Sequence, residues 1–346
     1  MAGIFQNGVF SMGFDMDPTA AQILTLNANG NSSTTTPFAY GYSWTINNAY
    51  AGIQFGTNLT TVICGIRVYG ASLPGGGAGL FEWYDVTGAA VQLQLIVSGT
   101  GALQFYRGSG TSNPIGSASS AGIIAGAQWT YIETKVTISP TAGLVECRIN
   151  GNATPVISSS GLNTQATANT WVSGFNFGWP VVGYFDDWYM LDTTGASPLN
   201  SYLGNVQVKG DKPNNNSAVG GRNAWSPTNP TNVNYTNVGN IPANTSEYDF
   251  DSNVGDYDMF RFPPLTAATV FFLNEWAMLS LDSAGTRTVE LDCYSNGTDA
   301  VSAAVTPPGA GSPGYFNCPF VVDPHTGSAW TVSNAEVAEL GVKVAS

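Results

Sequence analysis

The most constraining feature of this chain is a series of short runs in which apolar and polar residues alternate. In the clearest run, Tyr131–Ser139, the even-numbered positions from 132 to 138 fall on one face and the odd-numbered positions from 133 to 137 on the other. A period of two is typical of a half-buried antiparallel β-strand, and helical periodicity is nearly absent. Gly, Asn, Pro and Ser, which form turns, separate the runs. The sequence therefore predicts an all-β chain.

The alternating runs also predict how some strands pair. A loop at Pro140–Gly143 leads from the first run into a second, Leu144–Asn150, and we expect the two to form a β-hairpin. Ala267–Leu279 lacks Gly and Pro and is the one place where a helix competes, but its Val270–Phe272 favours a strand. Asn27–Thr36 is predicted to be a loop. Further strands are expected at Thr60–Tyr69, Leu80–Asp85, Ala90–Val97, Leu103–Tyr106, Trp171–Phe177, Tyr184–Leu191, Thr269–Leu281, Arg287–Tyr294 and Ala329–Val344.

The chain is too long for one typical domain, because 346 residues exceed the size at which a single core stops growing. We expect two β-sandwich (jelly-roll) domains, at 1–205 and 251–346, the second being the smaller. An Asn/Pro-rich segment, 206–250, is expected to form an extended arm or interdomain crossing. It is rich in aromatic residues, and we predict that three of them form an interface with the first domain or with a neighbouring subunit: Trp225, Tyr235 and Tyr248.

Composition narrows the class of protein. Charged residues make up only 10% of the chain, against about 25% in ordinary globular proteins, so the polar surface consists mainly of Asn, Thr, Ser and Gly. Such a surface suggests a permanent complex. The formal charge of −13, without any cluster of Lys and Arg, argues against nucleic-acid binding. The first residues lack the pattern of a signal peptide and no run is long enough to span a bilayer, so we expect neither export nor a membrane partner.

Three segments within 127–195 carry a family resemblance: QWTYIETKVTIS, GLVECRING and FNFGWPVVGYFDDWYMLDTTG. Together they resemble the concanavalin A-like, or laminin-G-like, jelly roll of tailed-bacteriophage structural proteins. The resemblance implies a non-enzymatic subunit of a virion, either capsid-decorating, head-fibre or tail-associated, that acts through protein–protein interfaces. Its partners would be other virion proteins and further copies of itself, with a trimer as one arrangement. It would be assembled in the host bacterial cytoplasm.

A glycan-binding protein of the tail or fibre, which would recognise a host receptor, is the alternative function. Loops at one end of the first jelly roll would then hold the saccharide. The sequence does not separate head from tail, or these two functions from each other.

One pair of carboxylates is a candidate metal site. Asp186 and Asp187 lie in an aromatic strand, and carboxylates near loop oxygens can hold Ca²⁺ in lectin-type jelly rolls. Adjacent strand residues face opposite sides, however, so at most one of the two can point into a given site. We expect a structural role for the pair, with calcium as the alternative, and no other cofactor.

Other polar residues give no pattern of a catalytic centre. Glycoside hydrolysis requires two carboxylates that face each other, whereas Glu82 and Asp85 are three apart and should lie on opposite faces of a strand. His325, the only histidine, lies beside Pro and Gly in an expected turn. The acidic cluster between Asp249 and Asp258 lacks the register of a calcium-binding EF-hand loop. We therefore expect no enzymatic activity.

The four cysteines are scattered without a CxxC pair, which argues against a zinc site or a dense disulfide framework. Cys64 and Cys147 both occur in alternating runs at apolar positions and should be buried. A disulfide between these two cysteines is left open by the sequence.

Overall fold

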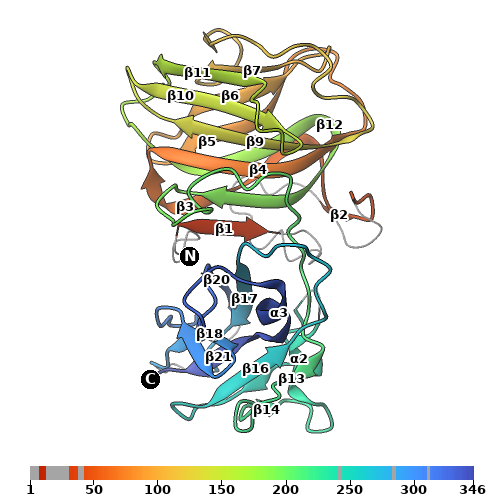
Figure 1. Cartoon of the computed structure of the whole chain (residues 1–346), viewed down its shortest axis with the longest axis vertical. Helices are drawn as coiled ribbons and strands as arrows, with labels where there is room; N and C mark the ends of the chain where they lie inside the picture. Colours follow the sequence, from red (N-terminus) through yellow and green to blue (C-terminus); the bar gives the residue numbers. More distant parts are fainter. Residues whose placement is uncertain (1–7, 13–30, 38–42, 241–242, 283–285, 310–311) are drawn as a thin grey trace. The chain divides into compact units, whose positions relative to one another are not determined.

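The computed structural model describes residues 8–12, 31–37, 43–240, 243–282, 286–309 and 312–346 (Figure 1). Two compact units divide the chain, one ending at Gly210 and the other running from Asp211 to Ser346. We call them the N-terminal unit and the C-terminal unit. The regular structure is nearly all β in both, which confirms the predicted all-β fold class. No helix in the described ranges is long and apolar enough to cross a membrane.

The N-terminal unit is a β-sandwich whose two sheets share two long strands, β3 (Ser43–Leu59) and β12 (Val172–Leu191). The later half of β12 continues one sheet through β4 (Thr61–Gly70), β9 (Trp129–Thr137), β10 (Gly143–Ile149) and β11 (Ile157–Leu162). The earlier half of β12 continues the other through β5 (Ala78–Asp85), β6 (Ala90–Val97), β7 (Leu103–Arg107) and β8 (Pro114–Ile115). Two short strands complete the unit: β1 (Val9–Met12) pairs with β12, and β2 (Asn31–Ser33) pairs with β3.

The two long strands bend together from one sheet into the other. Their pairing shifts register between Trp179 and Val182, next to Pro180, and the opposing Asn48 has a φ of 48°. Bulges of this kind let a strand turn a corner without losing its ladder. The aromatic core between the sheets includes Trp44, Trp83, Trp179, Trp188, Phe105 and Phe175, all essentially inaccessible to solvent. Sequence predicted the two ends of β12 as separate strands, and the structure joins them into one.

The predicted hairpin is confirmed. Strands β9 and β10 pair antiparallel with Val136 opposite Val145 and Ile132 opposite Ile149. Cys64 and Cys147 each lie opposite Thr134, from the strands on either side of β9. They are thus two strand spacings apart, on the order of 9–10 Å, beyond the roughly 7 Å that a disulfide can bridge. All four cysteines are buried and unpaired.

The C-terminal unit contains one five-stranded sheet and two short ribbons. The sheet runs in the order β13 (Asn215–Asn216), β16 (Tyr257–Arg261), β21 (Glu339–Val344), β18 (Val289–Ser295) and β19 (Thr298–Val301). The ribbons are β14 (Ser226–Pro227) with β15 (Asp249–Phe250), and β17 (Leu273–Leu279) with β20 (Gly314–Phe320). Two short helices, α2 (Asn234–Val238) and α3 (Val332–Val337), complete the described elements. The hydrophobic core gathers Leu291, Cys293, Cys318, Phe320 and Trp330.

Several predicted element boundaries were wrong. The expected strand Thr269–Leu281 extends only over Leu273–Leu279, which leaves Val270–Phe272 outside it. Only Glu339–Val344 of the expected strand Ala329–Val344 is a strand, because α3 precedes it. The Thr331 hydroxyl accepts a hydrogen bond from the Asn334 backbone N–H at 3.2 Å and so caps that helix. Within the expected loop Asn27–Thr36, residues 31–33 form strand β2, and 27–30 lie outside the described residues.

The segment at 206–250 contributes short elements to the C-terminal unit from Asp211 onward. Asn215 pairs with Arg261, and Ser226 pairs with Phe250. Frequent Pro and Asn keep these strands to two residues, since Pro cannot donate to a ladder and Asn favours turns. In the stretch Ala267–Leu279, where the sequence favoured a strand over a helix, the structure has a strand at Leu273–Leu279.

Candidate functional site

The two carboxylates predicted as a calcium site lie at a β-bulge. Asp186 pairs with Arg67, whereas Tyr189 pairs with Gly65, so the two residues between them oppose a single residue of β4. Asp187 has a φ of 52°, in the left-handed region. Regular alternation does not apply at such a bulge, so alternation alone does not set the directions of these two side chains.

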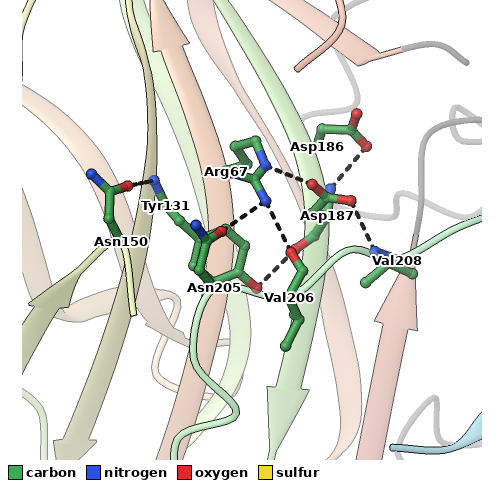
Figure 2. A network of polar contacts seen from close by, with 8 residues as sticks. All are labelled: Arg67, Tyr131, Asn150, Asp186, Asp187, Asn205, Val206 and Val208. Atoms are coloured by element: carbon green, nitrogen blue, oxygen red, sulfur yellow. Dashed lines mark hydrogen bonds and ion pairs between the residues drawn. The ribbon is translucent and has the colours of Figure 1, made fainter. Parts of the chain in front are cut away.

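Asp187 is bonded to protein donors through both carboxylate oxygens (Figure 2). Oδ2 accepts from Nε of Arg67 at 2.6 Å, and Oδ1 accepts from the backbone N–H of Val208 at 2.8 Å. Oδ1 of Asp186 in turn accepts from the Asp187 backbone N–H at 2.8 Å. Burial raises the pKa of Asp187, and the Arg67 guanidinium opposes that rise. Because protein donors already bind both of its carboxylate oxygens, Asp187 is better suited to anchor the Val208 segment than to bind calcium.

Arg67 extends this network to the segment that follows the sandwich. Its Nη2 donates to Oδ1 of Asn205 at 2.9 Å and to the carbonyl of Val206 at 3.0 Å. The guanidinium lies 4.9 Å from the ring centroid of Tyr131, whose hydroxyl donates to the Asp187 carbonyl at 3.2 Å. We call Leu199–Val208 the strap. It lies over the outer face of the sheet and is held there by hydrogen bonds to the Arg67 and Asp187 side chains, which form a buried ion pair with each other.

Glu133 holds the strap at a second point. Its Oε1 accepts from the Tyr189 hydroxyl at 2.6 Å and from the backbone N–H of Gly204 at 2.8 Å. Alternation placed Glu133 on the outward face, but the strap covers that face and leaves the residue 1% exposed. Burial raises the pKa of Glu133, while its hydrogen bonds oppose the rise. The Arg67, Asp187 and Glu133 network is therefore structural.

A second polar cluster lies on the other sheet, where four neighbouring strands contribute one residue each. Oε1 of Glu82 accepts from Nε2 of Gln94, and its Oε2 accepts from Nδ2 of Asn176, both at 3.1 Å. Nε2 of Gln94 also lies 3.4 Å from the Tyr50 hydroxyl. A Cβ at Gly79 would lie 2.1 Å from that hydroxyl oxygen and would clash with it. Only glycine at this position therefore leaves room for the Tyr50 hydroxyl in the cluster. These side chains form a neutral-donor cage around one carboxylate.

The cage has unused hydrogen-bonding capacity. Oδ1 of Asn176 has no partner, although the residue is only 3% exposed. Burial raises the pKa of Glu82, and burial together with the Glu82 charge raises the pKa of Tyr50 to about 12. At neutral pH the Tyr50 hydroxyl can therefore still donate. Hydroxyl and amide groups of this kind are what a saccharide binds.

Glu82 has no carboxylate partner for acid–base catalysis in this cluster. The nearest acid in sequence, Asp85, accepts from the Gly88 backbone N–H at 2.8 Å, from Thr167 Oγ1 at 2.7 Å and from Asn169 Nδ2 at 2.9 Å. These bonds hold the pKa of Asp85 below its ordinary value against the effect of burial. Asp85 therefore organises a loop. Within the described ranges, no group of three or more His, Cys, Asp or Glu residues could hold a metal ion.

Exposed large hydrophobic side chains are confined to the C-terminal unit among the described residues. All of the large hydrophobic residues that are exposed belong to it: Val233, Val238, Tyr248, Phe250, Val254, Val301, Val322 and Val337. Val233 precedes helix α2 and Val238 is its last residue, while Nδ2 of Asn237 in this helix donates to the Tyr248 carbonyl at 3.3 Å. The rings of Tyr248 and Phe250 lie 6.4 Å apart, edge to face. We call Val233, Val238, Tyr248 and Phe250 the exposed patch.

Of the three predicted interface residues, Tyr248 belongs to the exposed patch. Trp225 is half-buried, and its Nε1 donates to the Asp256 carbonyl at 3.3 Å. Tyr235 is also half-buried, with its backbone N–H bonded to Oδ1 of Asn216. Sequence could not point to Phe250 because single exposed aromatics have no signature in a segment without clear alternation.

Two members of the predicted acidic cluster meet in the interior. Asp249 and Asp258 are hydrogen-bonded to each other, and Nδ2 of Asn237 and of Asn234 donate to them at 3.1 and 2.7 Å, respectively. Burial, reinforced by the neighbouring Asp249, raises the pKa of Asp258 to about 9. The pair therefore holds a proton at neutral pH.

His325 lies exposed in a turn, where its backbone N–H donates to Oδ1 of Asp323.

Comparison with known proteins finds no matching family model. It finds no matching curated protein either. Among solved structures, the chain is similar to a cellulose-induced protein, Cip1, with 14% identity over 49% of this chain and 88% of that one, at a TM-score of 0.36. A carbohydrate-binding module, CBM66 of Bacillus subtilis, matches with 12% identity over 49% of this chain and 95% of the other, at a TM-score of 0.33. The chain spans only 31% of a Trypanosoma rangeli sialidase, with 14% identity over 55% of this chain and a TM-score of 0.34.

Proposed function

We propose that this protein is a non-enzymatic structural subunit of a tailed-bacteriophage virion, which assembles through the exposed patch of its C-terminal unit. The observation that supports this function is the uneven distribution of exposed apolar side chains, which in soluble proteins mark contact surfaces. Tyr and Phe in particular are enriched in the cores of interfaces. The phage context rests on the sequence resemblance in 127–195. Assembly would take place in the host cytoplasm, without a cofactor.

The partner that we propose for the exposed patch is a second copy of this chain. Closed homo-oligomers are the commonest assemblies of soluble proteins. The low content of charged residues, 10% of the chain, reduces the cost of bringing like surfaces together. A trimer is one such closed arrangement. Other capsid or tail subunits would then bind the assembled oligomer.

Imaging of intact particles tests this function most directly. We expect density for the two β-units at symmetry-related positions, with residues 233–250 in contact with protein. Labelled antibodies against the chain should decorate the same positions. Particles that lack the chain altogether would contradict the proposal.

Glycan binding is a second candidate function, favoured by the Tyr50, Glu82, Gln94 and Asn176 cluster. The half-buried Tyr50 hydroxyl could bond to sugar hydroxyls, and Asn176 would keep the Glu82 carboxylate beside it in place. A glycan array probed with the full chain tests this candidate. Loss of array binding in Asn176→Ala, with binding retained in the variant Asp251→Ala, would support it, and the absence of any bound glycan would remove it.

A further inference from the structure

An open hollow of about 370 Å³ lies at the edge of the N-terminal sandwich. It is lined by the end of β7, by the edge strands β8 and β11 and by the adjoining turns: Arg107, Ser112, Asn113, Pro114, Ile115, Gly116, Leu162 and Asn163. The strands β8 and β11 end the two sheets, and each pairs on one side only within the described residues. A Cβ at Gly116 would lie 2.3 Å from Oγ of Ser159, which brings the two sheet ends close together here.

Arg107 occupies an unusual position in this hollow. Along β7, Leu103 and Phe105 are fully buried between the sheets, and Arg107 follows them at the same phase of the strand. It also pairs with Leu93, another core residue. Residues opposite each other in an antiparallel pair share a face, so the Arg107 side chain continues the core-facing row. A charged residue therefore stands where the sandwich interior meets the hollow.

No carboxylate neutralises Arg107 within the described part of the chain. Three other arginines do have acidic partners: Arg67 with Asp187 at 2.6 Å, Arg148 with Glu146 at 2.8 Å and Arg222 with Asp299 at 2.6 Å. The contrast is notable in a chain that has 23 acidic and only 10 basic residues. Arg107 is half-buried and has no acidic partner, so its guanidinium is free to bind an anion through charge-assisted hydrogen bonds.

We propose that this hollow binds a small ligand that carries one carboxylate and several hydroxyl groups, as an acidic monosaccharide does. The planar guanidinium of Arg107 matches a carboxylate in two parallel hydrogen bonds. Neutral polar residues, namely Ser112, Asn113 and Asn163, surround it and suit hydroxyl groups. A doubly charged phosphate fits less well, since one cation cannot balance it and the net charge of −13 repels it.

This site is distinct in residues from both the exposed patch and the Glu82 cluster, and it does not depend on either function proposed above. A purely structural Arg107, whose aliphatic stem merely covers the end of the core, is the competing account. The two accounts differ in one respect: only the first gives the wild-type chain a measurable affinity for the ligand.

Titration of the full chain with D-glucuronate, followed by calorimetry, tests the site, with D-glucose and inorganic phosphate as comparison ligands. We expect saturable binding of glucuronate, weaker binding of phosphate and none of glucose. Arg107→Gln should weaken glucuronate binding by about tenfold or more, because it removes the charge-assisted bonds. Arg107→Lys should bind with intermediate affinity, since it keeps the charge but loses the planar fork.

Arg148→Gln serves as the matched control, because the Arg148 guanidinium is already paired with Glu146. It should bind glucuronate as the wild type does. Unfolding curves for each variant would establish that it folds. The proposal is overturned if wild-type chain binds glucuronate no better than glucose or phosphate, or if the two Gln variants bind it equally.

Discussion

The two units of this chain differ in the large hydrophobic side chains that they expose and in the hydrogen bonding of their buried acids. In the N-terminal unit, Glu133 and Asp187 are buried but accept hydrogen bonds from named donors, and no large hydrophobic residue among those described is exposed. The C-terminal unit exposes the Tyr248 and Phe250 rings and buries acids that share a proton or lack donors. Both oxygens of Asp292, for example, have no hydrogen-bond partner, and the nearest basic group, Nη1 of Arg222, lies 3.9 Å away.

This difference is what we expect if a partner covers the exposed patch of the C-terminal unit, as proposed above. Exposed aromatic side chains and undercompensated buried acids both carry free-energy costs that association or proton uptake can offset.

Replacement of Arg67 by Met should cause the largest loss of stability. The substitution leaves the Asp187 carboxylate buried without its counter-charge and releases the strap, at a cost of about 3–5 kcal/mol. Urea unfolding of the full chain measures the change in the free energy of unfolding. Adding Asp187→Asn to Arg67→Met should recover part of it, since the unpaired charge is removed while Asn tolerates the left-handed backbone.

Arg148→Met is the control for that experiment. Its ion pair with Glu146 is partly exposed, so the expected loss is about 1 kcal/mol or less. Equal losses in the two variants would show that the buried network does not hold the N-terminal unit together.

Raising the pH should destabilise the C-terminal unit. Folding raises the pKa of Asp258 from 3.8 to about 9 and that of Asp292 to about 7, mainly through burial, so the folded state keeps protons that the unfolded chain releases. The free energy of unfolding therefore falls from about pH 4 up to the folded pKa, by about 1.4 kcal/mol per pH unit for each such proton. Above about pH 9 this contribution no longer changes.

Hydrogen exchange at pH 5, 7 and 9, analysed separately for peptides of each unit, measures this dependence. Asp258→Asn should flatten the pH dependence in the C-terminal unit, because the amide stays neutral. Asp251→Asn should leave it unchanged, since the half-buried Asp251 carboxylate accepts hydrogen bonds from the neighbouring Ser252 and Asn253 backbone N–H groups and does not contact Asp258. A slope unaffected by Asp258→Asn would rule out the shared proton.

Phe250→Ser should change the free energy of unfolding of the isolated chain by less than about 0.5 kcal/mol, because the ring is 52% exposed. Phe260→Ser, ten residues later in β16 and 6% exposed, should cost about 3 kcal/mol or more through loss of core packing. Chemical denaturation at low protein concentration measures both. A large loss in Phe250→Ser alone would mean that the exposed patch supports the fold of its own unit.

Reducing agent should have no effect on either unit. The four cysteines are buried and unpaired, and burial raises the pKa of each thiol, which keeps it unreactive. Thermal unfolding with and without dithiothreitol measures this. A lower melting temperature under reduction would reveal a disulfide that the strand spacing excludes.

Sequence alone could predict the fold class and most central strands, because alternation records which side of a strand is buried. The hairpin of β9 and β10 is the best example, since Val136 and Val145 share the core face. Alternation fails where another segment covers the polar face, as the strap does over Glu133, and where a bulge interrupts the period, as at Asp187. Neither the covering segment nor the bulge produces a recognisable pattern in the amino-acid sequence around these two residues.

The candidate sites were less accessible to prediction for a related reason. Glu82, Gln94 and Asn176 are far apart in the sequence and meet only because β5 lies between β6 and β12. Arg107 is a lone cation at the end of a short strand, and its missing partner becomes visible only when all contacts are known. In Asp249 and Asp258, by contrast, the sequence did show a cluster, but it could not show which two of its acids are buried.

The central claim is that the exposed patch is covered by a second copy of this chain. The molar mass of the full chain in solution, measured by light scattering across a range of concentrations, tests it most directly. We predict an oligomer for the wild type and for Val301→Ser, which alters an exposed residue outside the patch, and a monomer for the double variant Tyr248→Ser, Phe250→Ser. A monomeric wild type, or a double variant that oligomerises as the wild type does, would contradict the account.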